Sequence, residues 1–235
     1  MLSMPARVLS IVHQRDAGPG VFADVDARLE QWLPRKAPPP SLDGYDAAMV
    51  FGGAMNADEE DRHPWLRPEK ELLREALDRG LPVLGVCLGS QLLAEAAGAE
   101  PHRSPEPEIG WYEIELSPEA AGDKVLSGLP ERFEGFVWHS YESPLPPAAT
   151  PLARSPRCLQ AFRLEGRPAW GIQFHAEVTE DTVGRWLADF RSDGDAMRMG
   201  LDVEALRAET RGKIGAWMDT GRKIARRFVA AATRA

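Results

Sequence analysis

The first hundred residues alternate between short apolar runs and longer amphipathic segments, and this alternation restricts the fold more than any other feature of the chain. Three apolar runs have the length and composition of buried strands: Arg7–His13, Asp46–Phe51 and Leu81–Val86. Three further segments have helical spacing or composition: Val21–Leu33, Pro68–Arg79 and Leu88–Ala97. Strands and helices in strict alternation predict a parallel sheet with helices on both faces, that is, a doubly wound α/β domain.

The second half of the chain has a different pattern. Four strand-like runs are separated by turns rich in proline and glycine: Gly110–Leu116, Gly135–Tyr141, Cys158–Leu164 and Ala169–His175. Several of them alternate apolar and polar residues, as half-exposed or antiparallel strands do. We therefore expect one α/β domain with a mixed sheet over residues 1–192. A loop near Ser192–Gly200 is expected to join it to a C-terminal helical extension over residues 193–235.

Charge and composition exclude several classes of protein. The net charge is −8, and residues 201–235 carry eight basic and four acidic side chains, so this tail is +4 and residues 1–200 are −12. An acidic body disfavours nucleic acid and anionic membranes as partners. No apolar run approaches the roughly 18 residues of a membrane span, and the N-terminus lacks a signal peptide's apolar core. We expect a soluble, cytoplasmic protein, too short at 235 residues for a second large catalytic domain.

The two cysteines, Cys87 and Cys158, are too few for a disulfide framework or a cysteine-rich metal site. Cys87 lies in the sequence Gly85-Val86-Cys87-Leu88-Gly89, between a buried strand and a helix. Such a tight turn needs small neighbours if its central side chain is to stand clear as a nucleophile. The helix N-terminus also stabilises a thiolate, and the Leu88 N–H is placed to meet an oxyanion. The alternative is that Cys87 is a small buried core residue.

A catalytic thiol needs a base, and His175 is the strongest candidate. It ends an apolar strand in Gly171-Ile172-Gln173-Phe174-His175-Ala176-Glu177, and Glu177 is placed to fix the imidazole tautomer. Four other histidines compete: His13, His63, His102 and His139. His13 and His139 also lie at strand ends, but no acid follows either of them two residues later. A hydrogen-bonded structural histidine is the alternative interpretation of His175.

Gly52 and Gly53 follow the second predicted strand. Two glycines at the carboxyl end of a sheet strand let a backbone N–H approach a ligand closely, although an ordinary tight turn explains the pair equally well. The next segment, Asn56–Pro68, is acidic and polar, and we expect a solvated connection, with a loop over the site as the alternative.

The tail carries an apolar stripe among basic residues: Thr210, Ile214, Trp217, Gly221, Ile224 and Phe228. We expect this stripe to pack onto the body of the same chain. A homodimer contact, an acidic partner surface or a lid over the site are the alternatives, and a membrane-surface helix is disfavoured by the charge of the body.

Four sequence segments together resemble the class I, triad-type glutamine amidotransferase domain. They are FGGAMN, GVCLGSQLLA, WHSYE and AWGIQFHAEV, which occur in that family's order over roughly residues 5–190. The GGAM form and the EIGW segment (Glu108–Trp111) are closest to free-standing members related to the GMP synthase amidotransferase. The resemblance implies a flavodoxin-like three-layer α/β fold with a central mixed, mostly parallel sheet.

The resemblance also implies an activity and a set of residues. The family hydrolyses the side-chain amide of glutamine through a cysteine γ-glutamyl thioester and releases ammonia to an acceptor. Carried over by motif, Cys87 is the nucleophile, His175 the base and Glu177 the orienting acid. The oxyanion hole is implied to be the N–H groups of Gly53 and Leu88, and the substrate-binding residues are implied to be Gly52, Gln91, Ser140 and Tyr141. Family members need no metal for this reaction, and the chain has no phosphate-binding glycine loop, so we expect no cofactor.

One departure from the family pattern and three competing functions accompany this interpretation. The family has proline where this chain has Ala176, a change that keeps both functional side chains of the motif. Some relatives are γ-glutamyl peptidases that use the same triad with a different leaving group. A catalytically silent binding protein and a cysteine redox protein on a related fold are two more competing functions. Since the chain has no synthase domain, the ammonia acceptor would be a separate polypeptide or absent.

Overall fold

The structure, a computed structural model, describes residues 4–233. Its strands are β1 (Ala6–Ile11), β2 (Ala27–Trp32), β3 (Ala47–Val50), β4 (Val83–Val86), β5 (His102–Leu116), β6 (Arg132–Glu142), β7 (Ala149–Arg154), β8 (Leu159–Leu164) and β9 (Ala169–Ile172). Its α-helices are α1 (Leu66–Asp78), α2 (Leu88–Ala96), α3 (Glu180–Ala188), α4 (Gly194–Arg198) and α5 (Val203–Ala232). Three short 3₁₀ helices are η1 (Gly20–Asp24), η2 (Pro118–Gly122) and η3 (Phe190–Ser192).

The nine strands form one sheet in the order β2-β1-β3-β4-β9-β8-β7-β5-β6. The first five strands of this order pair in parallel, and the other four join through antiparallel pairs. The predicted doubly wound α/β fold with a mixed sheet is therefore confirmed. Strands β4 and β9 are neighbours, with Val86 opposite Ile172, so the segments that follow them leave the same edge of the sheet.

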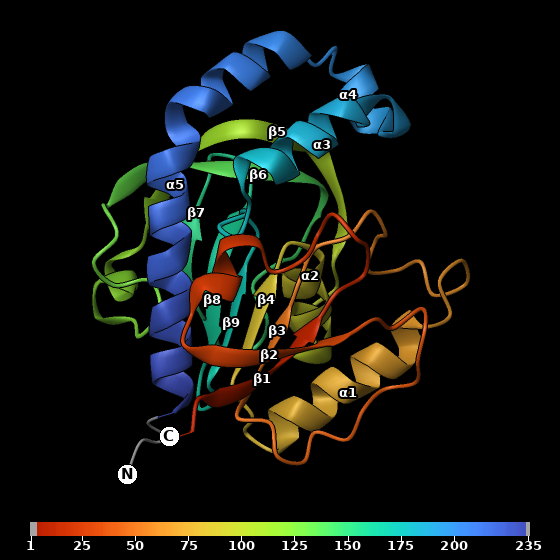
Figure 1. The fold of residues 1–235 in the computed structure, drawn as a ribbon, viewed down its shortest axis with the longest axis vertical. Helices are drawn as coiled ribbons and strands as arrows, with labels where there is room; N and C mark the ends of the chain where they lie inside the picture. Colours follow the sequence, from red (N-terminus) through yellow and green to blue (C-terminus); the bar gives the residue numbers. More distant parts are fainter. Residues whose placement is uncertain (1–3, 234–235) are drawn as a thin grey trace.

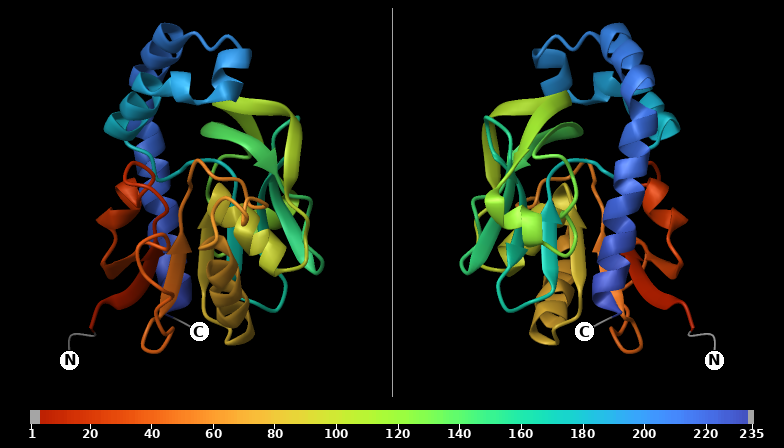
Figure 2. Two further views of the ribbon diagram at one scale, coloured as in Figure 1. Left: turned by 90° about the vertical axis from the view of Figure 1, so that its right-hand side faces the viewer. Right: turned by 90° about the vertical axis from the view of Figure 1, so that its left-hand side faces the viewer.

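Helices cover both faces of the parallel part of the sheet (Figures 1 and 2). Helices α1 and α2 pack on one face over Leu9, Ile11 and Val50. Helices α3 and α5 cover the other face, where the alternate strand residues such as Val8 and Met49 lie. This division follows from strand geometry, because successive side chains of a strand point to opposite faces.

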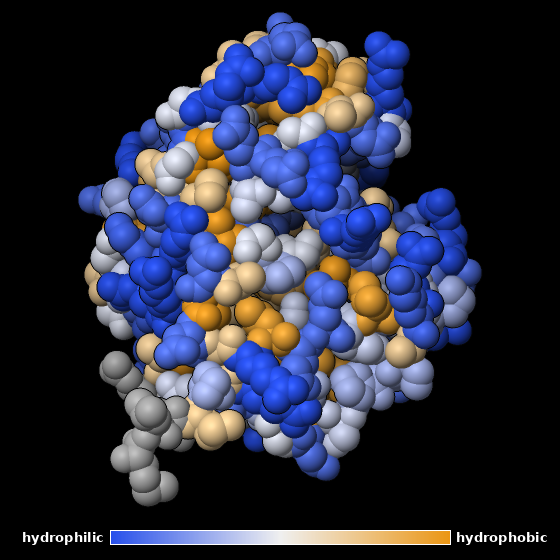
Figure 3. All heavy atoms as spheres, in the orientation of Figure 1, coloured by the Kyte–Doolittle hydropathy of each residue, from blue (hydrophilic) through white to orange (hydrophobic). Residues whose placement is uncertain are grey.

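Helix α5 is a structural part of this core. Its buried residues include the whole predicted stripe, and the apolar side chains of the stripe belong to the same cluster as the sheet: Ile214, Trp217, Ile224 and Phe228. The interpretation that the stripe packs onto its own body is confirmed, while the exposed side of the helix is mainly hydrophilic (Figure 3). No helix within residues 4–233 is long and apolar enough to cross a membrane.

Three local predictions are wrong. The segment Val21–Leu33 forms η1 and strand β2, because its backbone pairs in parallel with β1 and this pairing outweighs a helical spacing that the same apolar residues also satisfy. The proline-rich stretch before Pro151 leads into an unexpected strand, β7. The expected loop at Ser192–Gly200 contains the short helix α4, which Asp193 caps by accepting the N–H groups of two residues of the helix.

Candidate active site

Cys87 lies on a sharp turn between β4 and α2. Its φ of +53° is a left-handed conformation that non-glycine residues rarely adopt. The two flanking glycines are needed for steric reasons: a Cβ at Gly85 would lie 2.4 Å from the Gly89 carbonyl oxygen, and one at Gly89 would lie 2.1 Å from the Val50 oxygen. The turn therefore has the geometry of a nucleophile elbow, in which strain presents the central side chain at the sheet edge.

His175 and Glu177 follow β9 at the same edge of the sheet. The His175 Nδ1 lies 2.7 Å from the Glu177 Oε1, and both side chains are buried. A Cβ placed at Gly52 would lie 3.1 Å from the His175 Cε1 and 3.7 Å from the Cys87 Cβ, so the imidazole and the cysteine converge beside this glycine. The three residues predicted to form a triad are thus brought together.

Electrostatics at His175 favour its charged form. Burial alone lowers the pKa of an imidazole, but the nearby carboxylate of Glu177 and the Cys87 side chain outweigh that effect and hold the pKa of His175 well above its usual value. A ring with Nδ1 committed to Glu177 has its second nitrogen left for exchange of a proton with the thiol.

Three successive carbonyl groups fix the backbone of the His175–Glu177 segment. The Trp217 indole of α5 donates to the His175 oxygen at 2.7 Å, and the Val21 N–H donates to the Glu177 oxygen at 2.8 Å. The Ala176 oxygen packs so closely on α5 that a Cβ at Gly221 would lie 1.9 Å from it. Sequence reasoning missed this role of Trp217, for which the only signal was an indole N–H on a buried stripe.

Three of the four predicted substrate-binding residues, Gln91, Ser140 and Tyr141, line a common cavity of about 530 Å³, which also exposes Cys87 and His175. Gln91 donates from Nε2 to the Tyr141 carbonyl oxygen at 3.0 Å, which ties helix α2 to strand β6 beside the elbow. Ser140 and Tyr141 are half-buried in the wall of the cavity. Gly53 and Leu88 also line it, whereas Gly52 lies behind, against the His175 ring.

The far wall of the cavity comes from a part of the chain that the sequence interpretation left without a role. Asp193, the N-cap of α4, and Asp195 line it together with Trp138 and Arg103. The Trp138 indole donates to Asp193 at 2.7 Å, and Arg103 pairs with Asp195 at 2.5 Å. The loop between α3 and α5 therefore closes one side of the site with groups suited to a polar ligand.

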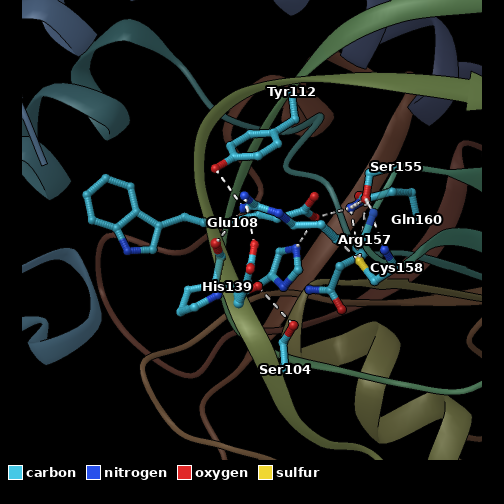
Figure 4. Close-up of polar contacts among 12 residues, drawn as sticks. Ser104, Glu108, Tyr112, His139, Ser155, Arg157, Cys158 and Gln160 are labelled. Carbon is cyan, nitrogen blue, oxygen red and sulfur yellow. Dashed lines mark hydrogen bonds and ion pairs between the residues drawn. The ribbon is translucent and has the colours of Figure 1, made fainter. Parts of the chain in front are cut away.

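Another cysteine, histidine and glutamate of the chain form a second cluster (Figure 4). Within residues 4–233, the one group of three side chains whose donor atoms could share a metal ion is Glu108, His139 and Cys158. A carboxylate hydrogen bond network accounts for their geometry: the Glu108 Oε2 lies 3.1 Å from the His139 Nε2, 2.8 Å from the Gln160 Nε2 and 3.4 Å from the Cys158 sulfur. Burial and the facing carboxylate raise the pKa of the Cys158 thiol, which favours its protonated form.

Comparison with known proteins decides the family. The profile of the family described as glutamine amidotransferase class-I matches residues 24–191, which is more than half of the chain. The chain belongs to the class-I glutamine amidotransferase family. The glutamine amidotransferase-like protein YfeJ of Salmonella typhimurium is 34% identical over 151 residues, covering 63% of this chain and 63% of that protein. The chain thus matches less than two thirds of the length of this relative.

Two further relatives agree with this assignment. The A subunit of the glutamine-hydrolyzing GMP synthase of Thermoplasma volcanium is 34% identical over 149 residues, covering 61% of this chain and 68% of that protein. A crystal structure of a glutamine amidotransferase from Thermotoga maritima superposes with a TM-score of 0.85 at 29% identity, covering 95% of this chain and 98% of the other. Because α5 spans 30 residues, this coverage includes most of that helix, beyond the last residue of the profile match.

Proposed function

We propose that this protein hydrolyses the γ-amide of glutamine, or of a γ-glutamyl compound, through a covalent thioester on Cys87. The observation that carries the proposal is the convergence of a strained cysteine elbow and a buried histidine–glutamate pair at one edge of the sheet. Membership of the class-I family supports the reaction type.

In the first half-reaction the Cys87 sulfur attacks the γ-carbonyl carbon as its proton passes to His175. The tetrahedral intermediate collapses when the C–N bond breaks, and His175 returns the proton to the departing amine. The products of this step are a γ-glutamyl thioester and free ammonia. Glu177 holds the imidazole by its Nδ1 and stabilises the positive charge that the ring carries between the two proton transfers.

In the second half-reaction a water molecule takes the place of the amine. His175 removes its proton, the hydroxyl attacks the thioester carbon, and the C–S bond breaks to release the glutamate carboxylate and the Cys87 thiol. Atoms balance over both steps, since one amide and one water give one carboxylate and one ammonia. No redox change occurs.

The remaining predicted residues would stabilise the negative charge of the intermediate or hold the substrate in place. The N–H groups of Gly53 and Leu88 would stabilise the oxyanion, and removing one such donor typically costs about 10²- to 10³-fold in kcat. Leu88 is the first residue of α2, so its N–H has no acceptor within the helix. Gln91, Ser140 and Tyr141 line the cavity beside the nucleophile and would hold the α-amino acid end of the substrate.

Two fates of the amine fit this site. The name of the Thermoplasma volcanium relative, which is one subunit of a synthase, supports transfer of ammonia to a separate synthase chain. The second candidate, a γ-glutamyl peptidase or hydrolase, is supported by the cavity itself, which continues from Cys87 to a wall built from Trp138, Asp193 and Asp195. A larger leaving group would occupy that space. A silent binding protein has no use for the aligned triad.

The test is an activity screen of the purified protein on glutamine, glutamyl amides and γ-glutamyl peptides, with ammonia or amine release as the readout. We expect Cys87→Ala to abolish turnover of the best substrate and Cys158→Ser, the matched control, to retain it. Turnover by Cys87→Ala at the wild-type rate would overturn the mechanism. Release of amines from γ-glutamyl peptides but not of ammonia from glutamine would favour the peptidase function.

A further inference from the structure

His13 follows β1 and is a fully buried histidine with an oxygen at each ring nitrogen. Its Nδ1 lies 3.0 Å from the Gly52 carbonyl oxygen, and its Nε2 lies 2.8 Å from the Glu69 Oε1 on helix α1. A carbonyl and a carboxylate only accept hydrogen bonds, so both contacts are made when both ring nitrogens donate. His13 is then an imidazolium paired with the Glu69 carboxylate.

The bond to the Gly52 oxygen fixes the peptide between Gly52 and Gly53. In a trans peptide the carbonyl and the following N–H point in opposite directions, and no cis peptide occurs among the described residues. A Gly52 oxygen held by His13 therefore turns the Gly53 N–H the other way. Gly53 lines the cavity, and within residues 4–233 its N–H donates to no protein acceptor.

The neighbouring atoms leave this turn little freedom. The next N–H, at Ala54, donates to the Gln14 side chain at 2.9 Å. A Cβ at Gly53 would lie within 3.0–3.1 Å of the Met55 sulfur, the His13 Cβ and a Leu88 methyl group. Trp65 stacks on the His13 ring, with centroids 5.6 Å apart. Side chains from β1, α1 and α2 thus converge on one peptide.

We propose that His13 and Glu69 are positioning residues that hold the Gly52–Gly53 peptide with its N–H aimed at the oxyanion. This inference rests on the proposed function, because it assigns the origin of one oxyanion donor of that reaction. Neither side chain touches the substrate. Their effect is exerted through the backbone, and it is greatest when negative charge develops on the γ-carbonyl oxygen.

A second pair of the same kind provides an internal comparison. The His139 Nδ1 lies 3.0 Å from the Tyr141 carbonyl oxygen, and its Nε2 lies 3.1 Å from the Glu108 Oε2 (Figure 4). This pair holds the backbone where the α-amino acid end of the substrate would bind, a group whose charge does not change in the reaction. Loosening this pair should weaken binding of substrate and transition state equally and raise KM, whereas loosening the His13 pair should lower kcat.

The experiment compares two amides at residue 13. His13→Asn places an N–H near the position of Nδ1 and keeps the bond to the Gly52 oxygen, whereas His13→Gln reaches toward Glu69 and loses it. We expect His13→Gln to lower kcat about 10²-fold with KM within about twofold, and His13→Asn to recover most of kcat. Glu69→Gln leaves a neutral ring that can still donate from Nδ1 to the Gly52 oxygen, so its loss of kcat should be smaller, about tenfold. Glu108→Gln should raise KM with kcat nearly unchanged.

Alkylation of Cys87 by iodoacetamide tests whether a variant loses only the oxyanion donor or instead disturbs the whole active site. This substitution forms no oxyanion, so its rate in Glu69→Gln should stay within about twofold of the wild-type rate. Wild-type kcat in folded His13→Gln or Glu69→Gln, or alkylation that slows in parallel with turnover, would overturn the inference. Glu69→Gln keeps the shape of the side chain and serves if the His13 variants do not fold. Failure of the proposed function is recognised separately, by turnover in Cys87→Ala.

Discussion

The molecule contains two groups of one cysteine, one histidine and one glutamate, and they are connected differently. In the first group the contacts run in series, from Glu177 to His175 to Cys87. In the second group the glutamate is the centre, and the Glu108 Oε2 faces His139, Cys158 and a glutamine at once. The same three residue types therefore give the arrangement proposed as a triad in one place and a hydrogen-bonded network in the other.

Two differences follow from this arrangement. A histidine can move a proton only if one ring nitrogen is free to reach the reacting group, and both ring nitrogens of His139 face oxygens that it already contacts. A thiol reacts as its thiolate, and the carboxylate beside the buried Cys158 raises the pKa of that thiol. Cys87 instead immediately precedes helix α2 and lines the cavity. The two groups contain the same residue types and differ in the hydrogen-bond partners of their histidine and in whether their cysteine lines the cavity.

The largest expected effect comes from the two histidines. His175→Gln removes the group that we propose accepts and returns the proton, so kcat should fall about 10⁵-fold or more, as for removal of a triad member in other enzymes. His139→Gln should lower kcat by less than about tenfold and act mainly on KM. Steady-state kinetics on the best substrate of the screen check both values. A comparable loss of kcat in the two variants would erase the distinction between the groups.

Glu177→Gln should lower kcat about 10⁴-fold, because an amide neither fixes the tautomer nor stabilises the imidazolium. It should also lower the pKa of His175, since burial lowers that pKa and Glu177 is a main reason that it is raised. An NMR titration of labelled imidazoles measures this shift directly. Glu108→Gln is the matched control, and the midpoint of His175 should not move in it.

The same shift predicts how stability depends on pH. A raised pKa in the folded state contributes stability that is fully present below the unfolded pKa of about 6.5 and is lost as the pH rises through the folded value. The unfolding free energy of the wild type minus that of Glu177→Gln should therefore shrink from pH 6 to pH 9. Urea titrations at the two pH values measure this difference in unfolding free energy. A difference that grows with pH would contradict the assigned protonation of His175.

The two groups also differ in what holds their backbone. Helix α5 packs on the Ala176 oxygen through Gly221, so Gly221→Ala should destabilise the fold by about 2 kcal/mol through overpacking and lower activity by displacing the His175–Glu177 segment. Gly215→Ala lies on the same helix with open space around it and should stabilise the fold by about 0.5 kcal/mol. Thermal unfolding of the two variants checks that the midpoint falls in Gly221→Ala and rises in Gly215→Ala. Equal shifts of the midpoint would show that the packing of α5 does not hold the His175–Glu177 segment in place.

Local sequence signals were sufficient for the elbow and for the histidine–glutamate pair. Gly85, Cys87 and Gly89 lie within five residues, and each glycine is required by an atom that a Cβ would strike. His175 and Glu177 are two residues apart at a strand end. Where the chemistry depends on neighbours in the sequence, the pattern itself predicts the site.

Contacts between distant segments were beyond the reach of the sequence. His13 and Glu69 are 56 residues apart and come together only because α1 packs on the face of the sheet that contains β1, so His13 could be considered only as a competing base. The segment Val21–Leu33 failed for the same reason, since its helical spacing is local and its pairing with β1 is not. The hydrogen bond from Trp217 to the His175 oxygen spans 42 residues and depends on where α5 docks.

The smallest expected effect is that of Cys158→Ala. The Glu108 Oε2 keeps its contacts with His139 and Gln160 after the thiol is removed, so activity should stay within about twofold of the wild type and stability should fall by about 1 kcal/mol. Under native conditions iodoacetamide should label Cys87 and leave Cys158 unlabelled, because Cys87 lines the cavity and the raised pKa of Cys158 favours its thiol. Peptide mass spectrometry of the labelled protein checks the site. Two outcomes would contradict this prediction: labelling of Cys158 in the folded protein, or a large loss of kcat in Cys158→Ala. Either result would mean that the second group takes part in the reaction. The different connection of the two groups would then not explain a difference in their roles.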